Sequence, residues 1–318
     1  GAVIVQGGVS EKLSGLTVGA DYYVQADGVL ASSSIPFDIS GASYASKSFS
    51  VASQDSAPAG FVFNSDGTKL FVVGTANDSV FQYSLSVAYD ISSASYDSVS
   101  FSVAPQDTTP YGLAFNPSGT KMYIAGSAND AVFQYSLSSA FDLSSASYDS
   151  VTLSISAQTT GPFDITFNND GTKFYIANPI PAQNTVLQYS MSSAYDLSTA
   201  SYDSVSFATS PQDSNSPRSV AFNSDGSKMF ITGQDTNSMY QYSLSSAFDI
   251  STASYDSVSF SLASQDTNIA HVDFNGNGSA FYMVGFTNDT IYQYSTTAAS
   301  TTVPAGRALS STSILLEG

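Results

Sequence analysis

The sequence contains no cysteine and no tryptophan, and several other residue types that carry chemistry are scarce. The absence of Cys excludes disulfides and thiolate chemistry. Glutamate occurs only at Glu11 and Glu317, and His271 is the single histidine. Nucleophilic triads and zinc sites, which need His beside Ser or Cys or in groups, therefore find no support. No apolar run approaches the ~18 residues that a membrane-spanning helix requires.

Positive charge is also scarce, with eight Lys plus Arg residues against 26 acidic ones and a formal net charge of -18. Nucleic acids and anionic membranes bind proteins through a positive surface, so both are excluded as partners. The acidity fits a soluble protein that works outside the cell. Simple solubility explains it equally well.

What the sequence does contain is a repeat. An aromatic-Asp-aliphatic-Ser landmark begins at Phe37, Tyr89, Phe141, Tyr195 and Phe248, with spacings of 52, 52, 54 and 53 residues. A fixed period of this size indicates a repeat architecture. Five copies are present, running from about residue 37 to residue 299.

Each copy contains four short runs with the composition of β-strands and none with helical periodicity. In the second copy the runs are Pro110–Phe115, Lys121–Ala125, Ala131–Leu137 and Ser150–Ile155. Gly112 and Ala114 in the first run allow a close approach of backbones. Four antiparallel strands repeated around a ring are typical of a β-propeller blade.

The order of strands predicts how the ring closes. The repeat region opens with Lys47–Val51, which matches the outermost strand, and ends with Ile291–Ser295, which matches the third strand. We expect the first of these to complete the last blade, giving a five-bladed propeller. A linear solenoid is the alternative, but it needs capping repeats that the sequence lacks.

The segments that flank the repeats, residues 1–34 and 300–318, contain further strand-like runs. Neither is long enough to bury a core by itself. We therefore expect an all-β protein in which both ends of the chain form one small β attachment domain, with the propeller of residues 35–299 inserted between them.

A turn motif, Asn-x-Asp-Gly-Thr/Ser-Lys, recurs at Asn64–Lys69, Asn168–Lys173 and Asn223–Lys228. A calcium loop needs alternating acids over twelve residues and a final bidentate Glu, which are absent. An Asx-capped hairpin turn with Gly at positive φ explains the motif. We therefore expect no metal site here.

A Gln-Asp pair precedes the innermost strand in four copies. The pairs are Gln54-Asp55, Gln106-Asp107, Gln212-Asp213 and Gln265-Asp266. Such side chains can bond loop amides, so we expect them to tie the connection to neighbouring backbone. A ring of ligand contacts is the alternative.

The positions where the copies disagree mark the candidate site. Innermost-strand residues that face the axis are small in most copies, and the exceptions are polar or aromatic. The candidate ligand-binding residues are Tyr111, Phe163, Asp164, Arg218, His271 and Asp273. A polar mouth with an aromatic rim suits a sugar or another small polar ligand. A water-filled channel that tolerates polar residues is the simpler interpretation, and both stay open.

Catalysis is not expected from these residues. Glycoside hydrolysis needs two carboxyl groups with separated pKa values, and the acid is typically Glu. Neither Glu11 nor Glu317 lies in the repeats, so an Asp would have to serve. Phosphate-binding glycine loops are absent as well. We therefore predict no catalytic residue, no metal and no cofactor.

The repeat core, P-x-G-x-A-F-N-x-x-G-T-K-x-Y-x-x-G, resembles β-propeller repeats of bacterial surface proteins and marine phage structural proteins. The flanks GLTVGADYYVQADGVLASSS and AGRALSSTSILLEG resemble a small β module of bacteriophage tail fibres, with Val18 where that module has Pro. The resemblance implies a virion appendage, trimer formation through the flanks, and an outward-facing propeller. It transfers no binding residues.

We accordingly predict a non-enzymatic tail-fibre or spike module, located on the virion, that recognises a host-surface glycan or protein. Its expected partners are other virion proteins, a homotrimer of its own chain and the host receptor. The alternatives are a decorative virion protein or a secreted bacterial surface propeller without a ligand. A glycan-active enzyme is the third hypothesis.

Overall fold

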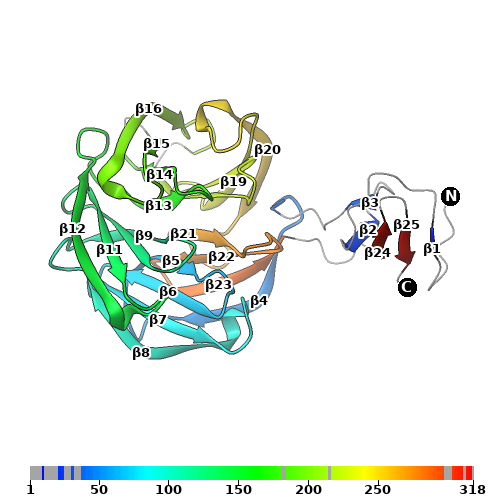
Figure 1. The fold of residues 1–318 in the computed structure, drawn as a ribbon, viewed down its shortest axis with the longest axis horizontal. Coiled ribbons are helices and arrows are strands. Elements are labelled where there is room, and N and C mark those ends of the chain that lie inside the picture. The colour runs from blue at the N-terminus through cyan, green and yellow to red at the C-terminus, as the bar shows by residue number, and fades with distance from the viewer. Residues whose placement is uncertain are drawn as a thin grey trace.

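A computed structural model describes residues 9–10, 21–24, 30–31, 37–180, 184–213, 216–296, 303–310 and 313–316. Five four-stranded antiparallel sheets are arranged around a common axis, which confirms the five-bladed propeller (Figure 1). None of the helices in the described part of the chain has the length and apolarity of a membrane span.

The blades follow the chain from the axis outward. Blade 1 contains β5 (Pro58–Phe63), β6 (Lys69–Gly74), β7 (Ser79–Leu85) and β8 (Ala94–Ser102). Blade 2 contains β9 (Pro110–Phe115), β10 (Lys121–Gly126), β11 (Ala131–Leu137) and β12 (Ala146–Ser154). Blade 3 contains β13 (Asp164–Phe167), β14 (Lys173–Asn178), β15 (Thr185–Met191) and β16 (Ala200–Ala208).

The remaining two blades repeat this order. Blade 4 contains β17 (Pro217–Phe222), β18 (Lys228–Gly233), β19 (Ser238–Leu244) and β20 (Ala253–Ser261). Blade 5 contains β21 (Ile269–Phe274), β22 (Ala280–Gly285), β23 (Thr290–Ser295) and β4 (Ser43–Ser50). Short 3₁₀ turns lead into four outer strands, at η1 (Ile91–Ser93), η2 (Leu143–Ser145), η3 (Leu197–Thr199) and η4 (Ile250–Thr252).

Blade 5 is completed by the first strand of the repeat region, as the strand order predicted. In Figure 1, β4 lies beside β23, and the two pair antiparallel with Lys47 opposite Gln293 and Phe49 opposite Ile291. The inner strands contact one another in sequence, and β21 contacts β5. The ring is therefore closed, and the solenoid alternative is wrong.

The hydrophobic core lies between neighbouring blades. At the seam, for example, Phe61 and Tyr83 of blade 1 cluster with Tyr282 and Val284 of blade 5, and all four side chains are fully buried. Equivalent clusters fill the other interfaces between blades. Because each sheet buries its faces against its neighbours, an isolated blade would leave these side chains in water.

The outer strands begin earlier than their alternating pattern suggested. In blade 2 the strand starts at Ala146, directly after η2, whereas the sequence predicted Ser150. Ser150 has a positive φ of 59°, and the pairing with β11 shifts register near it. The β-bulge interrupts the alternation of apolar and polar residues. The pattern therefore did not predict that the four residues before Ser150 belong to the strand.

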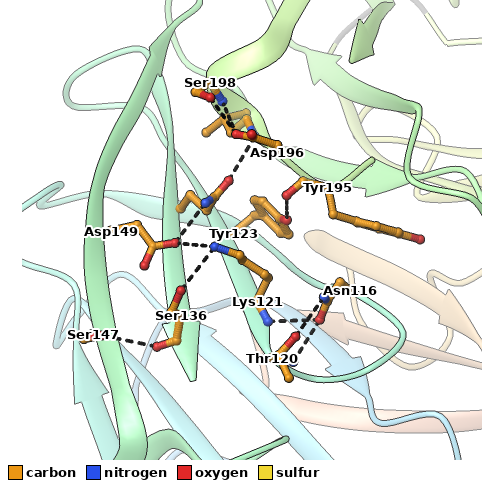
Figure 2. Close-up of polar contacts among 12 residues, drawn as sticks. Asn116, Thr120, Lys121, Tyr123, Ser136, Ser147, Asp149, Tyr195, Asp196 and Ser198 are labelled. Atoms are coloured by element: carbon orange, nitrogen blue, oxygen red, sulfur yellow. Dashed lines mark hydrogen bonds and ion pairs between the residues drawn. The ribbon is translucent and has the colours of Figure 1, made fainter. Parts of the chain in front are cut away.

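Conserved polar side chains within the repeat also join the blades, and the sequence analysis missed them. Gln134 Nε2 donates to Asp149 Oδ2 at 2.8 Å, while its Oε1 accepts from the Leu197 N–H of blade 3 at 2.9 Å. Figure 2 shows the neighbouring ion pair, in which Lys121 Nζ lies 2.8 Å from Asp149. The Gln of the Gln-Tyr-Ser motif was the available signal, since it occurs in all five copies.

A separate five-stranded sheet contains strands from both flanks. Its order is β1 (Val9–Ser10), β25 (Ser313–Leu316), β24 (Val303–Ser310), β2 (Asp21–Val24) and β3 (Leu30–Ala31). The division into an attachment domain of residues 1–34 plus 300–318 and a propeller of residues 35–299 stays a prediction.

Candidate functional site

The recurring turn and the Gln-Asp pair are structural, as expected. In the turn, Asn64 Oδ1 accepts from Lys69 N–H at 2.8 Å, and Gly67 has a φ of 72°. Asp55 accepts from the N–H groups of Ala57 at 2.8 Å and Asn77 at 2.9 Å. These contacts bind loops of the same blade, so the described residues give both motifs a full structural role.

The inner strands crowd at the axis, and this explains the small residues there. A Cβ on Gly60 would lie 2.7 Å from the carbonyl oxygen of Tyr111, and one on Gly112 would lie 2.8 Å from Ile165 N. Contacts this short leave no space for a side chain. Blades 1 and 2 therefore need glycine at this position.

At the equivalent position, blades 3 and 4 have a polar side chain that accepts a hydrogen bond from the next blade. Asp164 Oδ2 accepts from Val220 N–H at 2.9 Å, and Ser219 Oγ accepts from Val272 N–H at 3.1 Å. Each side chain thus reaches the inner strand of the next blade. Asp164 is fully buried, so its carboxylate holds backbone in place and offers no open face to a ligand.

His271 occupies the equivalent position in blade 5 and lies against Asp164. Its Nδ1 is 3.4 Å from Asp164 Oδ1, and its ring contacts Phe61 edge-on at 5.0 Å between centroids. Burial by itself lowers the pKa of His271, but the Asp164 carboxylate, Asp273 and the Phe61 backbone favour the imidazolium. The net effect raises the pKa of His271, so the two carboxyl groups favour its protonated form.

Asp273 faces the axis two residues further along β21. One of its carboxyl oxygens, Oδ1, accepts from Phe274 N–H at 2.8 Å. Burial raises the pKa of Asp273 to about 6, with the His271 charge acting in the opposite direction and Asp164 adding to the rise. A carboxyl group with such a pKa accepts and releases protons near neutral pH.

An axial cavity of about 270 Å³ opens beside this carboxyl group, and His271 and Asp273 both line it. Thr166 lies at the same level of the axis, and Phe141 and Tyr195 stand at the wall with asparagines of the turns. A second hollow of about 210 Å³ shares Thr166 and Asp273 with the first. The cavity therefore lies where the inner strands end, on the face of the recurring turns.

The other three candidates gather at the opposite end of the axis, where the inner strands begin. Tyr111 and Phe163 contact edge-on at 4.6 Å between ring centroids. The Arg218 guanidinium lies 4.2 Å above the Phe163 ring and 5.9 Å from that of Phe286. Of the six sequence-predicted residues, His271 and Asp273 thus line the cavity, Asp164 lies beside His271, and the other three cluster where the inner strands begin.

Several residues of these groups were not anticipated. Thr166 was aligned as axis-facing but not included, because a threonine among strand residues carries no chemical signal. Phe141 and Tyr195 belong to the landmark that defined the repeat. Each ring packs over the glycine of a recurring turn, and this packing places it at the cavity. Phe286 replaces Thr75 and Ser127 of other copies, and that difference was the available signal.

The ring of five sheets defines a β-propeller with a polar cavity on its axis. The sequence matches the family model described as "Lactonase, 7-bladed beta-propeller" over residues 47–248, well over half of the chain. The chain therefore belongs to this lactonase family, although it forms five blades and the family is described as seven-bladed. No curated protein matches the sequence significantly. Among the described residues, no three His, Cys, Asp or Glu side chains are grouped to hold a metal ion.

Two solved structures with lactonase titles are similar to this chain. The periplasmic gluconolactonase PpgL of Pseudomonas aeruginosa is 14% identical, with a TM-score of 0.48 and coverage of 82% of this chain and 70% of that one. A Bacteroides uniformis protein provisionally assigned as a 6-phosphogluconolactonase is 15% identical, with a TM-score of 0.45 and coverage of 64% and 55%. This chain thus spans about half the length of the latter protein. At these identities and TM-scores, neither similarity assigns a function to this chain.

The family match corrects the functional expectation. A non-enzymatic phage tail-fibre adhesin, and the statement that the chain is not an enzyme, are both contradicted by membership in a lactonase family. The β-propeller is confirmed, but nothing indicates a phage origin. We considered an Asp only as a substitute for the usual Glu, and no pattern in the sequence indicates that burial raises the pKa of Asp273 to about 6. The expected partners and virion location stay predictions.

Proposed function

We propose that this protein hydrolyses the ester bond of a small carbohydrate lactone in the axial cavity, with Asp273 as the general base. The observation that carries the proposal is the position of Asp273, whose carboxyl group lines the cavity with a pKa raised to about 6. Family membership supports the reaction class. The gluconolactonase name of one similar structure suggests sugar lactones as the substrates.

The cavity suits a substrate of that size and polarity. Its volume of about 270 Å³ is near the lower end of small-molecule sites, which have roughly 300–1,000 Å³. A single sugar ring fits such a space better than an oligosaccharide. The aromatic side chains Phe141 and Tyr195 offer apolar surface to the ring carbons, while Thr166 and the turn asparagines offer hydrogen bonds.

The reaction uses groups that the cavity contains. The Asp273 carboxylate accepts a proton from a water molecule, and the water oxygen attacks the carbonyl carbon of the lactone. The ring C–O bond then breaks, and the departing alkoxide takes the proton from Asp273, which yields the hydroxy acid. His271 lies 3.4 Å from Asp164, and its protonated form would stabilise the ionised form of the Asp273 carboxylate.

The first test is the hydrolysis of δ-gluconolactone by the purified full chain, corrected for the uncatalysed rate. Because Asp273 must be ionised to act as a base, kcat/KM should rise as the pH increases through about 6 and level off above it. Asp273→Asn should lower kcat by roughly 10²–10⁴-fold. The matched control is Asp130→Asn, at a turn between β10 and β11, which should retain the rate.

Two results contradict the proposal. One is the absence of hydrolysis above the uncatalysed rate for δ-gluconolactone and for a panel of other aldonolactones. The other is hydrolysis that Asp273→Asn leaves unchanged, which would place the reaction elsewhere in the molecule.

A further inference from the structure

The end of the axis opposite the cavity contains a buried cation without a carboxylate partner. Arg218 is only 9% exposed. The ion pairs formed within the described part of the chain involve Lys47, Lys121, Lys228 and His271, and none involves Arg218. Its Nε is buried and has no hydrogen-bond partner among the described residues. This donor therefore faces no acceptor in the part of the chain that the structure describes.

A cation in this situation is costly to the fold. Buried charges in proteins are normally paired, and an uncompensated one is strongly destabilising. Burial lowers the pKa of Arg218, which reflects this cost. The repeat does not require the charge, because the equivalent residues of the other blades are Ala59, Tyr111, Phe163 and Ala270. Because only blade 4 has arginine at this position, the residue indicates a function rather than a requirement of the fold.

The surrounding rings determine which part of the guanidinium is available. Phe163 lies under its face, with 4.2 Å from the guanidinium carbon to the ring centroid. Stacking of this kind occupies the face and leaves the N–H donors, which point outward in the guanidinium plane. Tyr111 lies edge-on to Phe163 at 4.6 Å and to Phe286 at 6.4 Å. All three aromatic side chains are partly exposed, so this end of the channel reaches the surface.

We propose that Arg218 binds the carboxylate group of a small organic acid, and that Tyr111 and Phe286 contact the hydrocarbon part of the same molecule. The planar fork of a guanidinium matches the two coplanar oxygens of a carboxylate. Aromatic walls favour an anion with an apolar body. A chain with a formal charge of -18 also repels a singly charged anion less than a doubly charged phosphate.

This carboxylate site is distinct from the axial cavity in place and in chemistry. Asp273 lies toward the ends of the inner strands, whereas Arg218 is the second residue of β17. The cavity offers a carboxyl group that exchanges protons, and the Arg218 site offers a fixed positive charge. Its test therefore uses binding alone and does not depend on lactone hydrolysis.

The experiment observes the signal of the Arg218 Nε–H group itself. Arg218 and Arg307 are the only arginines in the chain, so ¹⁵N-arginine labelling gives two Nε–H signals, and Arg218→Lys identifies one by deleting it. Sodium benzoate at constant ionic strength should shift the Arg218 signal with saturation and leave the Arg307 signal in place. Benzamide, which has nearly the same shape and no charge, should have no effect.

Variants extend the test to the whole site. Calorimetry with benzoate should show binding to the wild-type chain and to Lys173→Met, and at least a tenfold loss for Arg218→Met. Phe286→Leu, which keeps the charge, should weaken binding to a smaller degree. Because Arg218→Met removes an unpaired buried charge, its melting temperature should not fall, so loss of binding will not reflect unfolding.

Three outcomes overturn the proposal. The first is a benzoate titration without a saturable shift at Arg218, or one that benzamide reproduces. The second is preferential saturation by inorganic phosphate, which would assign the site to phosphate ligands. The third is full benzoate binding by Arg218→Met.

Discussion

At the residue scale, one turn position in each blade combines a left-handed backbone with an acid or amide side chain. The residues are Asp78, Asp130, Asn184, Asn237 and Asp289, with φ between 42° and 49°. Asp and Asn tolerate this conformation better than other residues with a Cβ. The carbonyl oxygen of Asp78 accepts from Val103 N–H at 2.9 Å, so the turn also anchors the exit of the outer strand.

Although the backbone of this turn is favourable for Asp, the carboxyl group of Asp78 lies in an unfavourable environment. Asp78 Oδ1 is buried without a hydrogen-bond partner among the described residues. Burial raises the pKa of Asp78, and the like charges of Asp107 and Asp55 raise it further. The charged form of Asp78 is thus disfavoured in the folded protein. Blades 3 and 4 avoid this cost with Asn.

We therefore expect Asp78→Asn to stabilise the protein at pH 7 by a few tenths of a kcal/mol, the scale of surface charge interactions. The folded-state pKa lies above the unfolded value of 3.8, so the gain should be present above the folded pKa. It should vanish as the pH falls below 3.8, where both states are protonated. Denaturant unfolding at several pH values measures this difference.

The matched substitution Asp130→Asn should have a smaller effect, because its carboxyl oxygens are not among the buried unpaired atoms. A stabilisation of Asp78→Asn that stays constant down to low pH would show that charge is not the cause.

At the scale of elements, two positions in each blade vary together. One is the last residue of the second strand, and the other is a residue in the loop before the first strand. In blade 2, a Cβ on Gly126 would lie 2.2 Å from Cγ of Asp107, because this carboxylate fills the space next to the glycine. Blades 1, 4 and 5 have the same Gly and Asp pair. Blade 3 has Asn178 and Thr159 in their place. The two positions thus change together within one chain.

This pairing predicts the result of a double-mutant cycle in blade 2. Gly126→Asn should destabilise the protein by about 1–3 kcal/mol, since the new side chain must displace the Asp107 carboxylate. Combining it with Asp107→Thr, which copies blade 3, should recover part of that loss, giving a favourable coupling energy of at least about 0.5 kcal/mol. Urea denaturation of the four proteins measures the coupling.

The same cycle with Gly126→Asn and Asp55→Thr, which lies in another blade, serves as the control and should show simple additivity. Equal coupling in the two cycles would contradict a local origin.

At the scale of the whole molecule, the stability of the ring depends on one antiparallel pair formed by the two ends of the repeat region. Ser50 of β4 lies opposite Thr290 of β23. The equivalent pair in blade 1 is Ser79 and Ser102, which are close in sequence. The geometry of the two pairs is the same, but only the first closes the ring.

Engineered disulfides should distinguish these two roles, and the natural chain has no Cys to interfere. Ser50→Cys/Thr290→Cys closes a loop of roughly 240 residues, whereas Ser79→Cys/Ser102→Cys closes one of roughly 24. The loop-entropy relation gives the ring-closing disulfide about 2 kcal/mol more stabilisation. Oxidised and reduced forms are compared by thermal unfolding, and equal gains would argue against closure at β4 and β23.

The number of blades also separates this chain from the family description. The family is described as seven-bladed, whereas the repeat region of this chain contains five copies that form five blades. With five, the inner strands approach so closely that a Cβ on Gly112 would lie 2.8 Å from Ile165 N. The axial channel therefore leaves only a small cavity at one end, and side chains cluster at the other end.

The sequence by itself determined the architecture of the propeller. The period, the strand runs and the unmatched strand Lys47–Val51 are local patterns, and a strand that lacks a partner within its own copy must find one elsewhere. The sequence indicated candidate site residues but not their arrangement, and their role in binding stays a prediction. Alignment identified Asp164, Arg218 and His271 as unusual, because each departs from small or apolar residues in the other copies.

Only the tertiary structure decided what those residues can do. The axial channel separates Arg218 from Asp273, although both were expected at one rim, because the two positions lie at different levels of the parallel inner strands. Asp164 accepts from backbone N–H groups of its own strand and the next blade, and it also pairs with His271. The raised pKa of Asp273 arises from burial and from neighbours contributed by different blades, and no sequence pattern within one copy contains that information.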